Sequence, residues 1–275
     1  MTDDSAADFA RETFTRRGTT HEILRSGSGP AVIVIAEIPG TTPRVLDFAR
    51  KVRDLGCTVI IPVLFGRVGH DPNPDSAGLL GAAGAMARAG VTMCVSREFT
   101  LLATGRTSPV VPWLRDLAAA EHQRCGGPGV GAVGMCLTGG FALAMATDER
   151  VLAPVLAQPA LPLGVTPWQQ RAIDTSPEDL AVVAARCAAG LKVLGLRFRG
   201  DRLVPAARFA HLKRVLGDGF VAIELDAEDA NPAGVMPPHS TLTEHLVDEP
   251  GTPTREALDQ VLDLFRTRLL DPDPA

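Results

Sequence analysis

The chain has 275 residues, of which 45% are hydrophobic and 21% are charged, as is typical of a soluble globular protein. Its net charge is −5 with both signs interspersed, and only 4% of residues are aromatic, so it lacks the basic surface and stacking rings of a nucleic-acid-binding protein. Because the N-terminus has no secretory signal and no apolar run approaches the roughly 20 residues of a membrane helix, the sequence predicts a cytoplasmic protein with no membrane partner.

The N-terminal part of the chain predicts a βαβ unit. Residues 1–20 are expected to form a loosely attached arm with a short helix over residues 6–15. The apolar run 31–36 does not alternate with polar residues, which is typical of a strand buried on both faces. A helical pattern over 42–55 and a second apolar run at 57–61 follow. A strand, a helix and a strand of these lengths imply a parallel sheet.

The rest of the chain continues this alternation after an interruption. Residues 66–108 are rich in Gly, Pro and small residues and predict an insertion over one end of the sheet. No internal repeat or linker is present, so residues 21–275 are expected to form one α/β domain. The later predicted strands cover residues 151–157, 191–198 and 220–225, and the predicted helices cover 112–120, 141–146, 209–216 and 253–269, with a further helix starting at Ser176-Pro177.

The five cysteines do not form a recognisable framework. Their number is odd, their spacing is irregular and no C-x-x-C occurs, which excludes a disulfide scaffold and a zinc knuckle. We therefore expect neither a metal nor an organic cofactor. Four of the five are expected to be small buried apolar residues, and Cys136 stands apart because of its surroundings. The five are Cys57, Cys94, Cys125, Cys136 and Cys187.

The segment 134–140, Gly-Met-Cys-Leu-Thr-Gly-Gly, lies between a short apolar strand and a helix. A nucleophile on such a sharp turn needs small neighbours, and Gly134 leaves the space that Cys136 requires. The following helix directs N–H groups and its positive end at the sulfur, which stabilises the thiolate, while the N–H of Leu137 can bind an oxyanion. The alternative is a structural cysteine; the glycines at 127–131 precede the strand and so do not match a dinucleotide-binding motif.

Candidate partners of the nucleophile follow it in the chain. Hydrolases of the α/β type carry nucleophile, acid and histidine in this order at the ends of successive strands. Asp201 directly follows one predicted strand, and His239 lies in the loop after the next. We expect His239 to act as the base toward sulfur and Asp201 to orient its ring. Asp226 is the alternative acid and His245 the alternative base.

Taken together, these motifs resemble the dienelactone hydrolase family, the carboxymethylenebutenolidases. The resemblance spans roughly residues 30–268 and implies an α/β-hydrolase fold that cleaves a small ester or lactone through an acyl-enzyme on Cys136. It rests on four features, namely Glu37-Ile-Pro-Gly40 after an apolar strand, the G-x-C-x-x-G turn at 134–139, Gly200-Asp201, and Pro238-His239 before a final helix.

The resemblance also implies roles for Glu37 and Ile38. In the family, a glutamate at the place of Glu37 contacts the resting thiol and is freed by substrate to help form the thiolate. The N–H of Ile38 is then the second oxyanion donor beside that of Leu137. A carboxylate at the end of a buried strand is costly unless it is paired or functional, so a structural salt bridge is the alternative for Glu37.

The sequence departs from the family pattern in two places. Thr138 stands where the family usually has Gly. Members that cleave dienelactone hold its carboxylate with arginines, one of them shortly after the catalytic histidine, whereas residues 240–244 contain none. Arg97 or Arg106 could supply one from the insertion. The sequence therefore favours another small ester or lactone, with a non-catalytic binding module or a redox-sensing thiol as rival functions.

Overall fold

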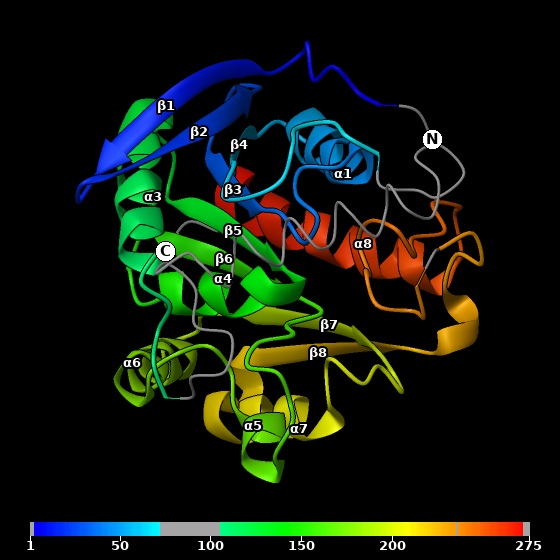
Figure 1. The fold of residues 1–275 in the computed structure, drawn as a ribbon. Coiled ribbons are helices and arrows are strands. Elements are labelled where there is room, and N and C mark those ends of the chain that lie inside the picture. Colours follow the sequence, from blue (N-terminus) through cyan, green and yellow to red (C-terminus); the bar gives the residue numbers. More distant parts are fainter. Residues whose placement is uncertain (1–2, 72–104, 235, 272–275) are drawn as a thin grey trace.

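An eight-stranded sheet with the order β1-β2-β4-β3-β5-β6-β7-β8 forms the centre of the computed structural model, which describes residues 3–71, 105–234 and 236–271 (Figure 1). Neighbouring strands from β4 to β8 are parallel, while β2 is antiparallel to both β1 and β4. The strands are β1 (Ala10–Arg16), β2 (Thr19–Ser26), β3 (Ala31–Ile35), β4 (Thr58–Pro62), β5 (Val130–Met135), β6 (Val151–Ala157), β7 (Val193–Phe198) and β8 (Phe220–Leu225).

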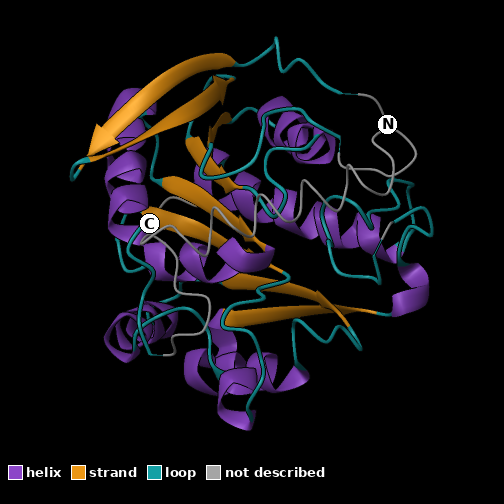
Figure 2. Cartoon of the chain, in the orientation of Figure 1, coloured by secondary structure: helices purple, strands orange, loops and turns teal. Residues whose placement is uncertain are grey.

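Helices cover both faces of this sheet, so the fold has three layers (Figure 2). Helices α1 and α8 pack on one face, and α3, α4, α6 and α7 pack on the other. The mostly parallel α/β sheet predicted from the sequence is confirmed. The helices are α1 (Pro43–Asp54), α3 (Val111–Cys125), α4 (Gly139–Met145), α5 (Pro167–Arg171), α6 (Pro177–Ala188), α7 (Ala206–Leu216) and α8 (Pro253–Phe265).

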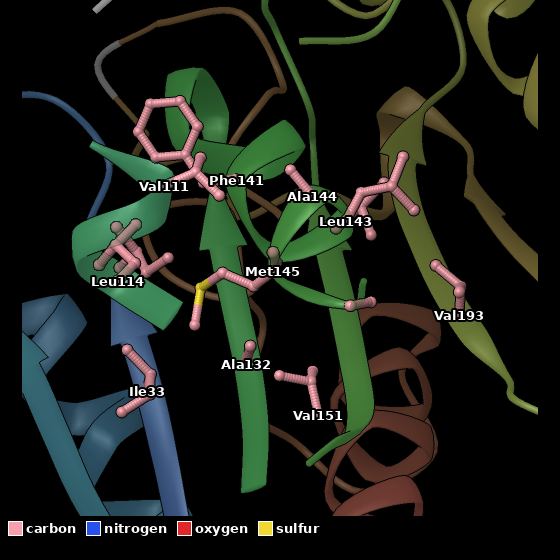
Figure 3. Close-up of a cluster of buried hydrophobic side chains, with 14 of the residues drawn as sticks. Ile33, Val111, Leu114, Ala132, Phe141, Leu143, Ala144, Met145, Val151 and Val193 are labelled. Carbon is pink, nitrogen blue, oxygen red and sulfur yellow. The ribbon is translucent and has the colours of Figure 1, made fainter. Parts of the chain in front are cut away.

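The apolar run of β3 shows why its sequence does not alternate. Ile33 and Ile35 join the hydrophobic cluster under α3 and α4, whereas Val32 and Val34 join the cluster under α1 and α8. All four are fully buried, because side chains on both faces of this strand meet helices. Figure 3 shows part of the first cluster, with Ile33 beneath the side chains of α3 and α4. The two cores hold the carboxyl ends of the central strands in fixed register.

The N-terminal arm expected over residues 1–20, with its short helix over 6–15, is wrong. Strand β1 occupies residues 10–16 and pairs along its whole length with β2. Arg17 and Gly18, both with positive φ (53° and 77°), form the two-residue turn that closes this hairpin. Most side chains of β1 are exposed, so the residues carry no apolar periodicity, and pairing with β2 decides their conformation.

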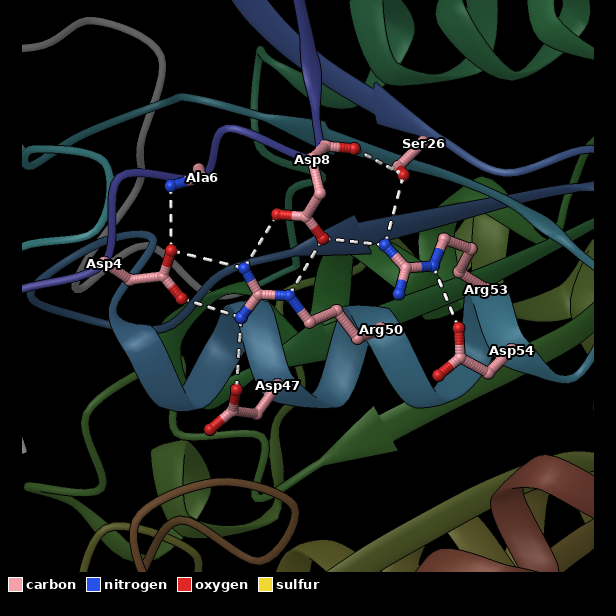
Figure 4. Close-up of polar contacts among 8 residues, drawn as sticks. All are labelled: Asp4, Ala6, Asp8, Ser26, Asp47, Arg50, Arg53 and Asp54. Atoms are coloured by element: carbon pink, nitrogen blue, oxygen red, sulfur yellow. Dashed lines mark hydrogen bonds and ion pairs between the residues drawn. The ribbon is translucent and has the colours of Figure 1, made fainter.

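Ion pairs fasten the segment before β1 to helix α1 (Figure 4). The guanidinium of Arg50 contacts Asp4 Oδ2 at 2.7 Å and Asp8 Oδ1 at 2.8 Å, and Arg53 contacts Asp8 Oδ2 at 2.7 Å. These contacts lower the pKa of Asp4 and of Asp8, since the charged carboxylates are hydrogen-bonded by the guanidinium groups. The N-terminal residues are therefore attached to the body of the domain.

The insertion expected over 66–108 falls largely on residues 72–104, which lie outside the described residues. Its last part is attached to the start of α6, where Thr107 Oγ1 donates to Asp179 Oδ2 at 2.6 Å. The predicted start of that helix is confirmed, with Ser176 Oγ accepting from the Asp179 N–H at 3.1 Å and Pro177 in the first turn. Among the helices of the described residues, none has the length and apolar character needed to cross a membrane.

Candidate active site

Cys136 lies on a sharp turn between β5 and α4. Its φ of 55° is a left-handed value that non-glycine residues rarely adopt, and a single 3-10 turn, Cys136–Thr138, leads from it into the helix. Strand β5 lies between β3 and β6, so the sulfur-bearing residue stands near the middle of the sheet at its carboxyl edge. In open α/β sheets this edge is where ligands bind.

Close backbone contacts explain the small residues of the turn. A Cβ on Gly134 would lie 2.1 Å from the carbonyl oxygen of Thr138, and a Cβ on Gly139 would lie 2.6 Å from Pro159 Cα. Thr138 itself, at the position where the family usually has Gly, fastens the turn to β3. Its Oγ1 accepts from the Met135 N–H at 2.8 Å and donates to the Ile35 carbonyl at 2.9 Å. The threonine therefore joins the nucleophile turn to the neighbouring strand.

We expect Gly134→Ala to lower the free energy of unfolding by about 1–3 kcal/mol, because the new methyl group overlaps backbone that has no room to move. Urea unfolding followed by circular dichroism measures this. Gly164→Ala is the matched control, since a Cβ there meets only side-chain atoms of Gln170 and Pro205, at 3.1 and 3.3 Å. Equal unfolding midpoints for the two variants would contradict the interpretation of the turn.

Asp201 and His239 come together although 38 residues separate them. His239 Nδ1 lies 2.6 Å from Asp201 Oδ2, and the two side chains are only 8% and 5% exposed. The other carboxylate oxygen of Asp201 accepts from the Leu203 N–H at 2.8 Å, which fixes the acid. His239 Nε2 is buried and has no hydrogen-bond partner among the described residues. This nitrogen is therefore free to exchange a proton with a reacting group.

The pKa of His239 connects this pair to Cys136. Burial on its own would lower that pKa, but the charge of the Cys136 thiolate and the hydrogen bond to Asp201 raise it well above the ordinary value. The sulfur therefore lies within electrostatic range of the ring. An imidazolium between a thiolate and a carboxylate is the charge arrangement that a cysteine nucleophile requires.

The alternative acid and base occupy other environments. Asp226 is half-exposed and accepts from Arg199 Nη1 at 2.8 Å. His245 is buried, and the hydrogen bonds of its ring indicate a neutral imidazole: Nε2 donates to the Met236 carbonyl at 2.9 Å, while Nδ1 accepts from the Ser240 N–H at 3.1 Å. His245 thus supports the loop that carries His239.

The other described cysteines differ in environment from Cys136. Burial raises the pKa of the Cys57 thiol to about 11, and burial also raises the pKa of the Cys187 thiol. Cys125 is partly exposed, and Cys94 lies outside the described residues. Across residues 3–71, 105–234 and 236–271, no group of three or more His, Cys, Asp and Glu side chains is arranged to hold a metal ion.

Glu37 follows the end of β3 and is buried among neutral donors. Its Oε2 accepts from Gln158 Nε2 at 3.0 Å and from Ser240 Oγ at 2.7 Å, and its Oε1 accepts from Thr243 Oγ1. Within the described part of the chain no basic side chain forms an ion pair with Glu37, so the salt-bridge alternative is not what the structure contains. The contact with the resting thiol of Cys136 remains a prediction.

Backbone donors and substrate-binding arginines were also expected. Ile38, next to Glu37, packs with Cys136 against the cluster under α3 and α4, so the two proposed oxyanion donors belong to adjacent parts of the site. The roles of the Leu137 and Ile38 N–H groups remain predictions. Arg106 is exposed, and Arg97 lies outside the described residues.

Arg208 is a buried residue of this region that the sequence reasoning missed. Its guanidinium is fully buried and binds only main-chain oxygens, including those of Ala172 and Pro159 at 2.6 Å after β6 and that of Leu203 at 3.4 Å after β7. Burial lowers its pKa to about 10, against the opposing charge of Asp201. Arg208 thereby joins the loop that follows β6 to the loop that carries the acid.

Comparison with solved structures shows the same fold in several hydrolases. A dienelactone hydrolase from Anabaena variabilis matches with a TM-score of 0.51 and 15% identity, over 95% of this chain and 98% of that chain. A dienelactone hydrolase-like promiscuous phosphotriesterase from metagenomic libraries matches with a TM-score of 0.54 and 17% identity, over 95% and 98%. A cold-adapted esterase from an Arctic intertidal metagenomic library matches with a TM-score of 0.55 and 15% identity, over 97% of each chain. At these identities the likeness establishes the fold.

The family assignment comes from the sequence. A comparison with curated proteins finds no significant match. The family model described as "Dienelactone hydrolase family" matches residues 20–182, which is more than half of the chain and includes β3, α1 and the Cys136 turn. The resemblance inferred from the motifs is thereby confirmed. The chain belongs to the dienelactone hydrolase family and is a hydrolase that acts on ester bonds.

Proposed function

We propose that this protein hydrolyses a small ester or lactone through an acyl-enzyme on Cys136, with His239 as proton carrier and Asp201 as the group that orients it. The observation that carries the proposal is the 2.6 Å contact between His239 Nδ1 and Asp201 Oδ2, which leaves a buried, unpaired Nε2 within electrostatic range of the sulfur. Nucleophile, base and orienting acid are the groups that acyl transfer needs.

In the first half of the reaction, the Cys136 thiolate attacks the carbonyl carbon of the ester. The electron pair moves to the carbonyl oxygen, which the N–H groups of Leu137 and Ile38 stabilise. Collapse of the tetrahedral intermediate breaks the carbon–oxygen bond, and the departing alkoxide takes the proton from His239 Nε2. An alcohol leaves, or in a lactone remains attached, and the acyl group stays on the sulfur as a thioester.

In the second half, His239 Nε2 takes a proton from water as the resulting hydroxide attacks the thioester carbon. The same backbone N–H groups hold the oxyanion. Collapse of this intermediate breaks the carbon–sulfur bond and returns the thiolate of Cys136 beside the imidazolium of His239. The carboxylic acid then leaves, and no redox partner or metal is required to balance either step.

Uncharged side chains after His239 support a substrate without an obligatory carboxylate. Ser240, Thr241 and Thr243 are buried, and their hydroxyl groups bind Glu37 and Gln158. No cation follows the histidine in this loop to hold an anionic group. A screen with nitrophenyl esters of varied acyl length and charge, together with simple lactones, tests this preference, and we expect neutral substrates to be turned over faster than acidic ones.

Selective alkylation separates an enzyme from a non-catalytic scaffold. We expect iodoacetamide near pH 7 to modify Cys136 much faster than Cys57 and Cys187, because burial raises the pKa of both of those thiols. Mass spectrometry of proteolytic peptides gives the rate at each cysteine. Loss of ester hydrolysis in parallel with Cys136 modification would support the proposal, whereas equal rates at all thiols would count against an activated nucleophile.

A further inference from the structure

Gln158 occupies an unusual place beside the proposed catalytic residues. It follows β6, is fully buried, and has a φ of 38°, a left-handed conformation that is uncommon outside glycine. Residues held in such conformations cluster at functional sites, where the surrounding structure maintains them. Its own N–H donates to the Leu196 carbonyl at 2.8 Å, so the backbone is fixed by the neighbouring strand β7.

The side-chain amide of Gln158 joins two parts of the site. Its Nε2 donates to Glu37 Oε2 at 3.0 Å. Its Oε1 accepts from Thr241 twice, from the backbone N–H at 3.1 Å and from Oγ1 at 2.8 Å. Glu37 precedes Ile38, and Thr241 lies two residues after His239. One amide therefore spans the distance between the strand end that carries an oxyanion donor and the loop that carries the base.

The residues that follow Gln158 extend this connection to the nucleophile turn. The Ala160 N–H donates to the carbonyl of Cys136 at 2.8 Å. Pro159 packs so closely on the turn that a Cβ on Gly139 would lie 2.6 Å from its Cα. A displacement of this segment would therefore be felt at Cys136.

The carboxylate of Glu37 completes the arrangement. Ser240 and Thr243 bind it from the histidine loop, while Gln158 binds it from β6. All three are uncharged donors, and each is itself buried. A carboxylate with three such hydrogen bonds is held in one orientation, because rotating toward the thiol would break bonds that water cannot replace in a buried site.

We propose that Gln158 is a positioning residue, which together with Glu37 fixes the His239 loop and the Ile38 N–H relative to Cys136. In this arrangement Glu37 acts as a fixed anchor rather than as a group that moves to activate the thiol. The inference rests on the proposed function, since it concerns the geometry of the same site. It assigns a role to a residue that touches neither substrate nor sulfur.

The test uses the full chain with Gln158→Met, which keeps the length of the side chain and removes both hydrogen-bonding groups. With 4-nitrophenyl acetate we expect kcat to fall about 10- to 100-fold, as misplaced catalytic groups commonly cause. KM should change by less than about threefold, because the acyl-binding surface is unchanged. The rate of Cys136 alkylation by iodoacetamide, followed against pH, should shift to higher pH, because a displaced imidazolium stabilises the thiolate less.

Two further variants keep the result interpretable. Gln170→Met is the matched control, since Gln170 makes a single 3.3 Å hydrogen bond to the Gly164 carbonyl on α5, and it should leave both profiles unchanged. Thr241→Val removes one donor to Gln158 and keeps the backbone N–H, so it should reproduce the same effects in weaker form. It serves if Gln158→Met does not fold, as judged by circular dichroism.

The readouts separate this inference from the proposed function. If the wild-type protein hydrolyses none of the esters, the alkylation profile of Cys136 still reports whether Gln158 positions the imidazole. An unchanged alkylation profile and an unchanged kcat in folded Gln158→Met would overturn the inference. A lower melting temperature with both profiles unchanged would do the same, because it would reduce Gln158 to a structural residue.

Discussion

Replacing Cys136 by alanine is expected to lower kcat/KM for ester hydrolysis by about four to six orders of magnitude, since removal of a nucleophile leaves only the oxyanion donors and substrate binding. The substitution removes one sulfur atom from a partly exposed position and leaves the backbone of the turn intact. The measurement is steady-state hydrolysis of a nitrophenyl ester at several enzyme concentrations, with circular dichroism to show that the variant is folded.

Two companion variants sharpen this result. Cys125→Ala removes another partly exposed thiol and should retain full activity. Cys136→Ser should retain little, because a hydroxyl does not form the low-pKa anion that pairs with the His239 imidazolium. Retained turnover in Cys136→Ala would overturn the assignment of the nucleophile, and a fully active serine variant would show that the thiolate is not the attacking species.

Replacing Asp201 by asparagine is expected to lower kcat about 100- to 10,000-fold and to change the pH dependence. Burial opposes protonation of His239, yet Cys136 and Asp201 together raise its pKa well above the ordinary value of 6.5. A raised pKa keeps the imidazolium present through neutral pH, and activity is lost as the pH rises through that value. Without the carboxylate the pKa falls, so the alkaline limb of kcat/KM should move to lower pH.

Asp226→Asn is the control for this experiment. Asp226 pairs with Arg199 and makes no contact with His239 among the described residues, so its profile should match that of the wild type. The outcome that would exclude Asp201 is an unshifted alkaline limb with kcat within about twofold of wild type. In that case the orienting acid would have to be sought elsewhere.

Much of the fold could be predicted because its central strands are buried on both faces. The runs at β3, β4 and β6 are apolar without alternation, and such runs leave few alternatives to a parallel α/β sheet. The proximity of Asp201 and His239 follows from the same reasoning. Each residue comes after the end of a parallel strand, and those ends share one edge of the sheet.

Other features depend on contacts that a single sequence does not reveal. The exposed residues of β1 become a strand only because β2 lies beside them. Gln158 and Glu37 are 121 positions apart, and a lone glutamine after a strand has no pattern that indicates its partner. The one available signal was its place at the carboxyl end of a parallel strand, where polar residues often face the site. Arg208 had no such signal.

The carbonyl partners of Arg208 have a consequence for how this site can diverge. A guanidinium that binds main-chain oxygens is indifferent to the side chains those residues carry. Exchanges such as those of the exposed Val165 and Trp168, on the loop after β6, can therefore alter what the mouth of the enzyme accepts while the acid keeps its place. Tolerance of new substrates and a rigid proton-transfer geometry are thus compatible in one scaffold.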